Sequence, residues 1–294
     1  MSRNQVWLIT GSSRGFGRSL ARAVLAAGHQ LVATARSTDS LVDLVEQHSD
    51  QVRTVPLDVT DPAAAQRAVD TAVAAFGRLD VVVNNAGYAN VAPIETVDPD
   101  DFRAQIETNF FGLVNVTRAA LPLFHRQRSG HFIQFATIGA RAGAPGLAAY
   151  QSAKWAVEGF SEVLAKETSS FGVKVTIIEP GGFRTDWAGS SMEVADYGTD
   201  YETTVAALAR YLRRMTGSEA GDPDRAAQAI LKITATAEPP LRLLLGGSAY
   251  RTAQLVTQQR AESDARWREL TESADFPDAH QDNDAESLTL QRNG

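Results

Sequence analysis

The sequence predicts an α/β fold: a doubly wound parallel sheet of about seven strands with helices on both faces. Three observations support this prediction. Short β-rich runs alternate with helical patterns along the chain, which is typical of parallel strands joined by crossover helices. The first β-rich run passes through a glycine-rich turn directly into a helical pattern. A chain of 294 residues, 44% of them hydrophobic, is long enough for one large domain with a deep core.

Seven β-rich runs are the predicted strands. Each is short and apolar, and turn or helix formers follow it. In chain order the runs are residues 5–10, 30–35, 51–56, 79–84, 131–136, 173–178 and 241–245. Ligands of such sheets bind at the carboxyl ends of the strands. The residues predicted to lie at that edge are Gly11, Arg36, Asp58, Asn85, Thr137 and Pro180.

The turn after the first strand, TGSSRGFG, has the features of a phosphate-binding turn. Gly11 permits the tight turn, and Gly15 lets backbone N–H groups approach a pyrophosphate at the helix N-terminus. Gly17 allows the following helix, RSLARAVLAAG, to pack closely on the sheet. The spacing is GxxxGxG and departs from the commoner GxGxxG.

Two later helices have recognisable beginnings. Asp61 followed by Pro62 predicts the start of a helix that ends near Phe76. The run Asp98, Pro99 and Asp100 predicts the next start, and TNFFGLVNVTRAALPLF continues that helix.

Tyr150 and Lys154 stand four positions apart in AAYQSAKWAVEGF. On a helix this spacing places both side chains on one face, so the ammonium can lie close to the phenol oxygen. A free phenol has a pKa of about 10, and a nearby cation can lower it by roughly 1 to 3 units. The pair therefore suits proton exchange with an alcohol or ketone. Taken alone, the spacing fits equally well an exposed aromatic residue beside a lysine.

The end of the second predicted strand indicates the form of the cofactor. A carboxylate there accepts hydrogen bonds from the ribose 2′-hydroxyl of NAD and would repel a 2′-phosphate. This chain has Ala35 and Arg36 instead. Arg36 and Arg14 together offer two guanidinium groups for a phosphate, which favours NADP(H). The alternative is that both arginines are solvated surface charges.

Five motifs stand in the order and spacing of the short-chain dehydrogenase/reductase family, which this chain resembles over about residues 4–248. They are TGSSRGFG at 10–17, NNAG at 84–87, Asn109, the pair Tyr150 and Lys154, and PGGFRT at 180–185. The resemblance implies a Rossmann-type catalytic domain over residues 1–248 and an NADPH-dependent ketoreductase or carbonyl reductase activity.

The resemblance also implies four catalytic roles. Tyr150 is the general acid of carbonyl reduction, and Lys154 lowers the phenol pKa and binds the nicotinamide ribose. Asn109 holds a water that links Lys154 to solvent, unless it is an ordinary helix-surface asparagine. Thr137 stands thirteen residues before Tyr150, where the family has serine, and keeps a hydroxyl to orient the substrate carbonyl. The alternative is a strand-end threonine without a role.

Further residues receive cofactor contacts from the same resemblance. Asp58 reaches the adenine amine, unless it is a helix cap or turn residue. Asn85 and Gly87 line the adenosine ribose, and Thr185 holds the nicotinamide carboxamide. The predicted cofactor site comprises Gly11, Ser13, Arg14, Gly15, Phe16, Gly17, Arg36, Asp58, Val59, Asn85, Gly87, Tyr150, Lys154, Pro180, Gly181 and Thr185.

The segment 187–217 is the predicted substrate lid and is rich in apolar and aromatic residues. It suits a hydrophobic ketone or secondary alcohol, although such residues at helical spacing also serve as core. Its large apolar residues are Trp187, Met192, Tyr197, Tyr201, Leu208, Tyr211, Leu212 and Met215.

Composition excludes several other classes of protein. The chain has no cysteine and five scattered histidines, so we expect no metal site. A net charge of −7 argues against a nucleic-acid surface. No run approaches the roughly 20 apolar residues of a membrane span, and the N-terminus leads straight into the first strand. We therefore expect a cytoplasmic protein with a small-molecule substrate.

The C-terminal part of the chain is predicted to form an extension of the domain. Residues 249–273 predict a helix with Leu255, Trp267 and Leu270 as its main apolar positions, docked on the domain or on a neighbouring subunit. Residues 274–294 are acidic and lack periodicity, which predicts a mobile tail. The family resemblance implies a homodimer or homotetramer.

Three functions remain open at this point. The first is an NADPH-dependent reductase of hydrophobic ketones. The second is an NAD-dependent alcohol dehydrogenase of the same family. The third is a sensor or scaffold that binds NADP(H) without turnover.

Overall fold

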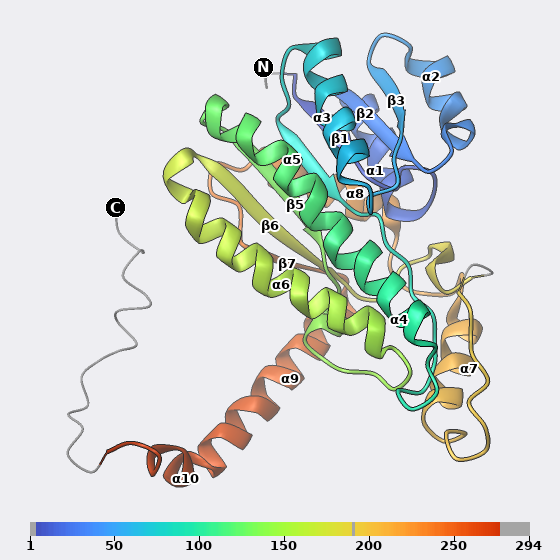
Figure 1. The fold of residues 1–294 in the computed structure, drawn as a ribbon, viewed down its shortest axis with the longest axis vertical. Coiled ribbons are helices and arrows are strands. Elements are labelled where there is room, and N and C mark those ends of the chain that lie inside the picture. Colours follow the sequence, from blue (N-terminus) through green and yellow to red (C-terminus); the bar gives the residue numbers. More distant parts are fainter. Residues whose placement is uncertain (1–3, 190–191, 277–294) are drawn as a thin grey trace.

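The computed structural model describes residues 4–189 and 192–276, and its core is a seven-stranded parallel sheet with helices on both faces (Figure 1). The strand order is β3-β2-β1-β4-β5-β6-β7, which confirms the predicted doubly wound architecture. The strands are β1 (Val6–Ile9), β2 (Gln30–Ala35), β3 (Val52–Pro56), β4 (Val81–Asn84), β5 (Gly130–Phe135), β6 (Val173–Pro180) and β7 (Arg242–Leu245). All seven predicted strands are present, with ends shifted by at most two residues.

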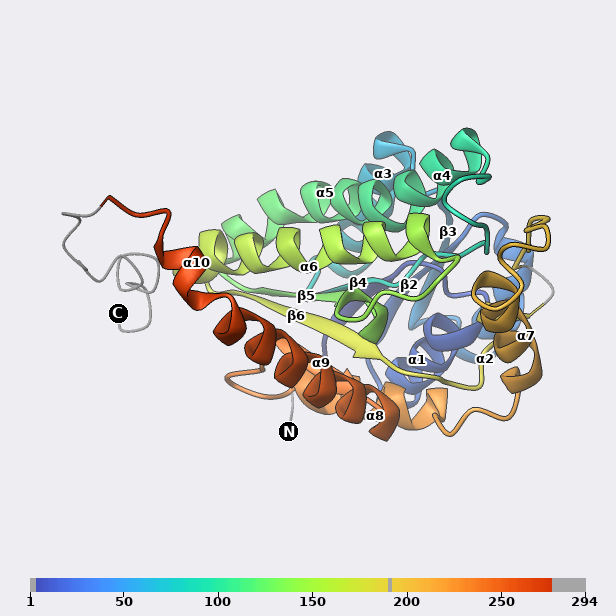
Figure 2. The same ribbon diagram turned by 90° about the horizontal axis from the view of Figure 1, so that it is seen from below.

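Helices cover the sheet in two layers (Figure 2). One layer contains α1 (Gly15–Ala26), α2 (Val42–His48) and α8 (Pro223–Thr234). The other contains α3 (Pro62–Phe76), α4 (Pro99–Ile106), α5 (Gly112–Gln127) and α6 (Ala148–Thr168). Short helical turns complete the chain: η1 (Thr38–Leu41), η2 (Glu107–Phe111), η3 (Ile138–Ala140), η4 (Ser169–Phe171) and η5 (Asp186–Ala188).

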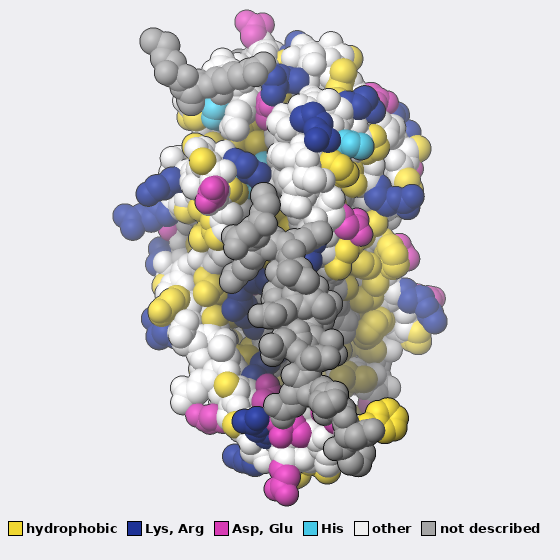
Figure 3. Space-filling model, turned by 90° about the vertical axis from the view of Figure 1, so that its left-hand side faces the viewer, with side chains coloured by type: hydrophobic (Ala, Val, Ile, Leu, Met, Phe, Trp, Pro, Cys, Tyr) yellow, Lys and Arg dark blue, Asp and Glu magenta, His cyan; other side chains and the backbone are white. Residues whose placement is uncertain are grey.

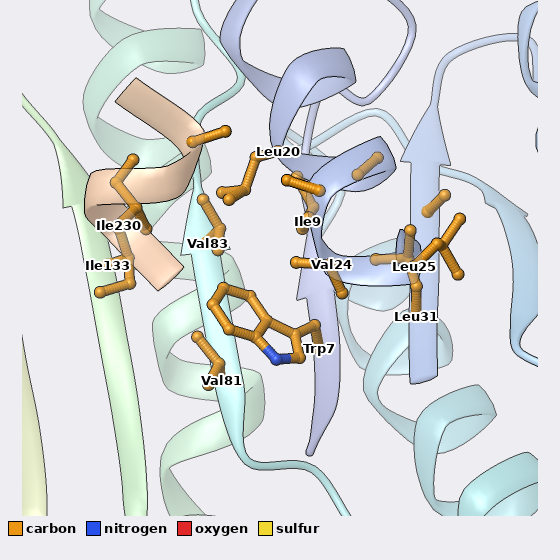
Figure 4. Close-up of a cluster of buried hydrophobic side chains, with 14 of the residues drawn as sticks. Trp7, Ile9, Leu20, Val24, Leu25, Leu31, Val81, Val83, Ile133 and Ile230 are labelled. Carbon is orange, nitrogen blue, oxygen red and sulfur yellow. The ribbon is translucent and has the colours of Figure 1, made fainter. Parts of the chain in front are cut away.

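The core follows from the alternation of side chains along the central strand. Trp7 and Ile9 face α1 and α8, where Leu20 and Ile230 pack against them (Figure 4). Val6 and its alternate neighbour Leu8 belong to the opposite cluster, under α3 and α5. Because both faces are covered, the strand is apolar at every position rather than alternating with polar residues.

The predicted helix starts are confirmed. Asp61 accepts a hydrogen bond from Ala63 N at 2.8 Å and so caps α3. Asp98 caps α4 by accepting from Asp100 N at 2.7 Å. α4 continues into α5 through η2, a turn of π-helix that contains Asn109.

A small lobe stands at the carboxyl edge of the sheet and contains α7 (Val205–Met215), whose Val205 packs with Val91 and Leu147 (Figure 1). It is tied to the segment after β4 by a parallel bridge between Val91 and Val194. Val91 N donates to Glu193 O at 2.9 Å, and Ala195 N donates to Val91 O at 2.9 Å. The predicted lid is therefore attached to the domain by backbone hydrogen bonds.

The C-terminal helical region differs in part from the prediction. It consists of α9 (Gly247–Arg266) and α10 (Arg268–Glu272) and extends away from the domain (Figures 1 and 2). Leu255, Trp267 and Leu270 are exposed, so these side chains do not dock on the domain, and the other predicted alternative, contact with a neighbouring subunit, stays a prediction. Small residues make the contact instead, because only Ala249 and Ala253 of α9 are buried. The predicted tail lies outside the described residues from position 277 onward.

The surface carries charges of both signs. On the face shown in Figure 3, acidic and basic side chains are interspersed with apolar ones. Within the described ranges, no helix is long and apolar enough to cross a membrane. In the same part of the chain, no group of three or more histidine, aspartate or glutamate side chains is arranged to hold a metal ion.

Candidate active site

The site begins where the strand order reverses, between β1 and β4. Thr10 joins the ends of these strands, because its hydroxyl donates to Val83 O at 3.2 Å and accepts from Asn85 N at 2.9 Å. The Asn85 side chain returns the contact by donating to Thr10 O at 2.9 Å. In a doubly wound sheet, the crevice at this reversal is where ligands bind.

The glycine turn leaves space and hydrogen-bond donors for a phosphate. Gly11 and Gly15 have φ angles of 69° and 55°, which side chains rarely tolerate. A Cβ on Gly17 would lie 2.2 Å from Gly11 O, so only glycine lets α1 approach the turn. The first turn of α1 contains no acidic residue, and Arg14 at its N-cap makes no side-chain cap. The N–H groups there fit the pyrophosphate of a dinucleotide.

The two arginines predicted to contact a 2′-phosphate have different surroundings. Arg14 Nη1 lies 2.8 Å from Asp186 Oδ2, and each side chain is half exposed. Arg36 is exposed at the end of β2 and is close enough to Tyr88 to influence the pKa of that phenol. No local pattern predicted the contact with Asp186, which is 172 positions away from Arg14.

Asp58 and Val59 follow β3. Asp58 Oδ1 accepts from Thr60 N at 3.0 Å and from Thr60 Oγ1 at 2.8 Å, so Asp58 is a turn residue here. The exposed side chain still faces solvent at the predicted edge. Val59 is buried, and its methyl groups pack where a Cβ on Gly112 would stand.

Tyr150 and Lys154 lie on the same face of α6, as their spacing predicts. Both are buried, with exposed fractions of 8% and 4%. Lys154 Nζ donates to Phe135 O at 2.7 Å and lies 5.8 Å from the centre of the Tyr150 ring. Burial lowers the pKa of Lys154 to about 8.

The pKa of Tyr150 moves opposite to the prediction. Burial raises it above its usual value, and only a hydrogen bond with the Thr137 side chain opposes the rise. The expected lowering by Lys154 is absent because the ammonium is directed to Phe135 O. Tyr150 is therefore a neutral phenol, with its proton in place, at ordinary pH.

Thr137 stands between Tyr150 and the loop that follows β5. Its hydroxyl accepts from Gly139 N at 3.2 Å and so caps η3. The loop is held from the other side by Gln151, whose Oε1 accepts from Ala144 N at 2.7 Å. Gln151 was not among the predicted site residues, although it follows Tyr150 directly.

Asn109 holds the segment after β4 against the helices. Its Oδ1 accepts from Tyr88 N at 3.2 Å, and its Nδ2 donates to Tyr88 O and Gln105 O, both at 2.8 Å. A Cβ on Gly87 would lie 2.4 Å from Asn109 Oδ1 and 3.6 Å from Lys154 Nζ. These three predicted residues therefore meet at one point.

The turn after β6 approaches the glycine turn. Thr185 side-chain carbons lie 3.6 Å from where a Cβ on Gly15 would stand. Gly181 N donates to Leu245 O at 3.0 Å, which extends the pairing of β6 with β7 beyond Pro180. Phe16 packs between Phe135 and Phe183, with ring centroids 5.4 and 4.9 Å away, so its ring belongs to the core.

Above Tyr150 the lid forms an apolar cluster. The Trp187 ring lies 5.2 Å from the Tyr150 ring, centroid to centroid. The cluster consists of apolar and aromatic side chains, whose polar atoms are the tyrosine phenols and the Trp187 indole N–H. Its members are Ala89, Val91, Ala144, Leu147, Tyr150, Trp187, Ala188, Met192, Val194, Tyr197, Tyr201, Val205, Leu208, Ala209 and Leu212.

Behind α6 lies a buried charged cluster that the sequence did not reveal. Glu179 on β6 is fully buried, and Arg141 Nε lies 2.8 Å from its Oε2. Arg242 on β7 lies 2.8 Å from Glu158 and 2.9 Å from Glu162. Burial and the neighbouring Glu179 raise the pKa of Glu158 to about 7.

Comparison with known proteins identifies the family. A model of the short-chain dehydrogenase family matches residues 5–195, which is more than half of the chain. The chain belongs to the short-chain dehydrogenase family. It is therefore an oxidoreductase, and its fold is one that binds nicotinamide cofactors.

Individual relatives agree with this assignment. Oxidoreductase BOA17 of Botryotinia fuckeliana is 50% identical over 91% of this chain and 98% of its own length. A 3-ketodihydrosphingosine reductase of Bacteroides thetaiotaomicron is 33% identical over 82% of this chain and 88% of its own length. A crystal structure of a short-chain dehydrogenase from Streptomyces avermitilis has a TM-score of 0.87 and 36% identity, and covers 93% of this chain and 100% of that one.

Proposed function

We propose that this short-chain dehydrogenase reduces a hydrophobic ketone to a secondary alcohol with NADPH. One observation carries the proposal: a neutral, buried phenol, Tyr150, lies between a hydroxyl, an ammonium group and an apolar cluster at the ligand edge of the sheet. This arrangement suits delivery of a proton to a carbonyl oxygen in a site from which water is excluded.

The cofactor, when bound, supplies a hydride to the carbonyl carbon. Tyr150 donates its proton to the carbonyl oxygen, so that hydride and proton together give the alcohol. Thr137 donates a hydrogen bond to the same oxygen and orients it toward the phenol. Lys154, whose ammonium lies 5.8 Å from the centre of the Tyr150 ring, is proposed to bind the nicotinamide ribose.

The remaining predicted residues are proposed to hold the cofactor. The N–H groups of the glycine turn suit its pyrophosphate, and Asn85 and Gly87 suit its adenosine ribose. Thr185 suits the nicotinamide carboxamide. Asn109 acts indirectly, because it fixes the backbone at Tyr88 beside Gly87 and Lys154. A water held by Asn109 for proton resupply stays a prediction.

Charge favours NADPH over NADH. Arg36 stands directly after β2 and Arg14 stands in the glycine turn, and the end of β2 has no carboxylate to bind a 2′-hydroxyl. Asp58, on the neighbouring strand, engages Thr60 rather than an arginine. It therefore leaves the positive charge of Arg36 available, whereas Arg14 is paired with Asp186 in the cofactor-free protein.

The apolar cluster around Tyr150 favours a hydrophobic substrate. A charged or strongly polar ketone would lose hydration there without gaining hydrogen-bond partners. The Bacteroides relative is named as a reductase of a keto group in 3-ketodihydrosphingosine, which is consistent with this class. We also propose that the protein is a homodimer or homotetramer, as members of the family often are. A cytoplasmic location stays a prediction from the sequence.

The test is a screen of NADPH and NADH oxidation against aliphatic, aryl and steroidal ketones, followed by the reverse reaction with the alcohols. The proposal expects reduction of apolar ketones with NADPH. Oxidation of alcohols with NAD as the only activity would favour the alcohol dehydrogenase alternative. Cofactor binding without turnover of any ketone or alcohol would favour a sensor or scaffold.

A further inference from the structure

The three-residue turn η5 touches both halves of the site. Asp186, its first residue, pairs with Arg14 of the glycine turn at 2.8 Å. Trp187, the next residue, packs on Tyr150 with its ring centroid 5.2 Å from the phenol ring. Two neighbouring residues of one short turn therefore contact Arg14, which is proposed to bind a phosphate, and Tyr150, the proposed proton donor.

The turn is a compact unit, so the two contacts are mechanically linked. Thr185 Oγ1 accepts from Trp187 N at 3.4 Å and caps the turn, and Gly189 N donates to Asp186 O at 3.0 Å. A shift of the Asp186 backbone must therefore move Trp187. Because Tyr150 is 8% exposed with Trp187 against it, such a shift changes access to the phenol.

Arg14 cannot pair with Asp186 and bind a phosphate equally well. A phosphate monoester carries a charge of about −1.5 to −2 at neutral pH and has three acceptor oxygens. Its larger charge favours it over a half-exposed carboxylate, although the guanidinium group can form bidentate contacts with either anion. A carboxylate left beside a bound phosphate is also repelled by it.

We propose that Asp186 and Trp187 form a gate that the cofactor's 2′-phosphate opens. In the cofactor-free protein, the Arg14–Asp186 pair holds η5 so that Trp187 covers Tyr150. A 2′-phosphate on Arg14 displaces Asp186, and η5 carries the indole away from the phenol. This inference rests on the proposed function, because it uses the assignment of Arg14 to the 2′-phosphate.

Two consequences follow for catalysis. NADPH must bind before the ketone, because the phenol is covered until Arg14 is engaged. NADH lacks the 2′-phosphate and binds without releasing Asp186, so its disadvantage includes a lower kcat and not only a higher KM. The Arg14–Asp186 ion pair is exposed and therefore weak. A variant that breaks this pair should lower the KM for NADPH by only about two- to five-fold.

The gate can be observed on Trp187 itself. The full-length protein is labelled with 5-fluorotryptophan, and the fluorine resonance of Trp187 is assigned by its loss in Trp187→Phe. The probes are adenosine 2′,5′-bisphosphate and adenosine 5′-monophosphate, each at saturation as judged by calorimetry. We expect the bisphosphate to shift the Trp187 resonance and the monophosphate to leave it in place.

The variant Asp186→Asn should move the same resonance toward its bisphosphate-bound position with no ligand present. The matched control is Glu202→Gln, which breaks another half-exposed ion pair of the lid, with Arg210, far from the glycine turn. It should leave the Trp187 resonance and the KM for NADPH unchanged. Circular dichroism of each variant shows that a change is not caused by unfolding.

The outcomes separate the gate from the proposed function. If the bisphosphate binds and neither it nor Asp186→Asn shifts the Trp187 resonance, the gate is wrong and the reductase proposal stands. If Asp186→Asn and Glu202→Gln have the same effect, the shift is a general response of the lid and the gate is also wrong. If the bisphosphate does not bind at all, the assignment of Arg14 is wrong, and both proposals fall.

Discussion

Thr137 offers a sharp test of the geometry, because its hydroxyl has two separable partners. It accepts from Gly139 N at 3.2 Å, which fixes η3, and it lies close enough to Tyr150 to oppose the rise in the pKa of that phenol. Thr137→Val removes the hydroxyl and nearly preserves the shape. Thr137→Ala removes both the hydroxyl and the methyl group, and Thr137→Ser removes the methyl group alone.

The magnitude follows from what each change leaves behind. A buried polar group that loses its hydrogen-bond partner costs about 1 to 3 kcal/mol. If the substrate carbonyl needs the Thr137 hydroxyl, this cost corresponds to about a 5- to 150-fold loss of kcat/KM. We expect that loss in both the valine and the alanine variants. Thr137→Ser should remain active, and bulky ketones should gain relative to small ones because the pocket loses a methyl group.

The assay is steady-state reduction of one small and one bulky ketone with NADPH, together with the melting temperature of each variant. The melting temperature reports the loss of the η3 cap, which is separate from catalysis. Full activity in both the valine and the alanine variants would refute the role of Thr137. Tyr150 would then position the carbonyl without help.

Three other predictions test separate parts of the account. Ala35→Asp combined with Arg36→Ala should reverse the preference for NADPH over NADH in kcat/KM, and an unchanged preference would remove Arg36 from the cofactor site. Gly87→Ala should lower activity by about ten-fold or more, because the new methyl group would overlap Asn109 Oδ1 at 2.4 Å, and normal activity with an unchanged melting temperature would contradict this packing. Folding raises the pKa of Glu158 to about 7, so the stability that this group contributes is fully present below about pH 4.5 and is lost as the pH rises through 7. Glu158→Gln should therefore flatten this part of the pH dependence of urea unfolding. An identical pH profile in the variant would contradict the assigned cause.

Local patterns predicted the fold well because each carries its own physical cause. Aspartate followed by proline caps a helix wherever it stands, as at Asp61 and Asp98, and four-residue spacing places Tyr150 and Lys154 on one helix face regardless of the rest of the chain. Gly11 was likewise expected to permit a tight turn, and its φ angle is 69°.

Contacts between distant segments were not predictable in this way. The Arg14–Asp186 pair and the packing of Trp187 on Tyr150 depend on how the lid turns after β6, which no local pattern encodes. The raised pKa of Tyr150 depends on burial that only the folded chain creates. The exposure of Leu255 on α9 shows that apolar spacing predicts a helix but not the surface that covers it.

The central claim is that Tyr150 donates the proton in a carbonyl reduction. Tyr150→Phe removes one hydroxyl from a buried ring and keeps the packing against Trp187. The decisive measurement is turnover of an apolar ketone by this variant, with NADPH affinity and circular dichroism measured on the same sample. We expect NADPH binding and fold to be preserved while turnover falls by roughly 10²- to 10⁴-fold, the contribution of a positioned general acid. Turnover near that of the unmodified protein would contradict the claim and assign the proton to another group.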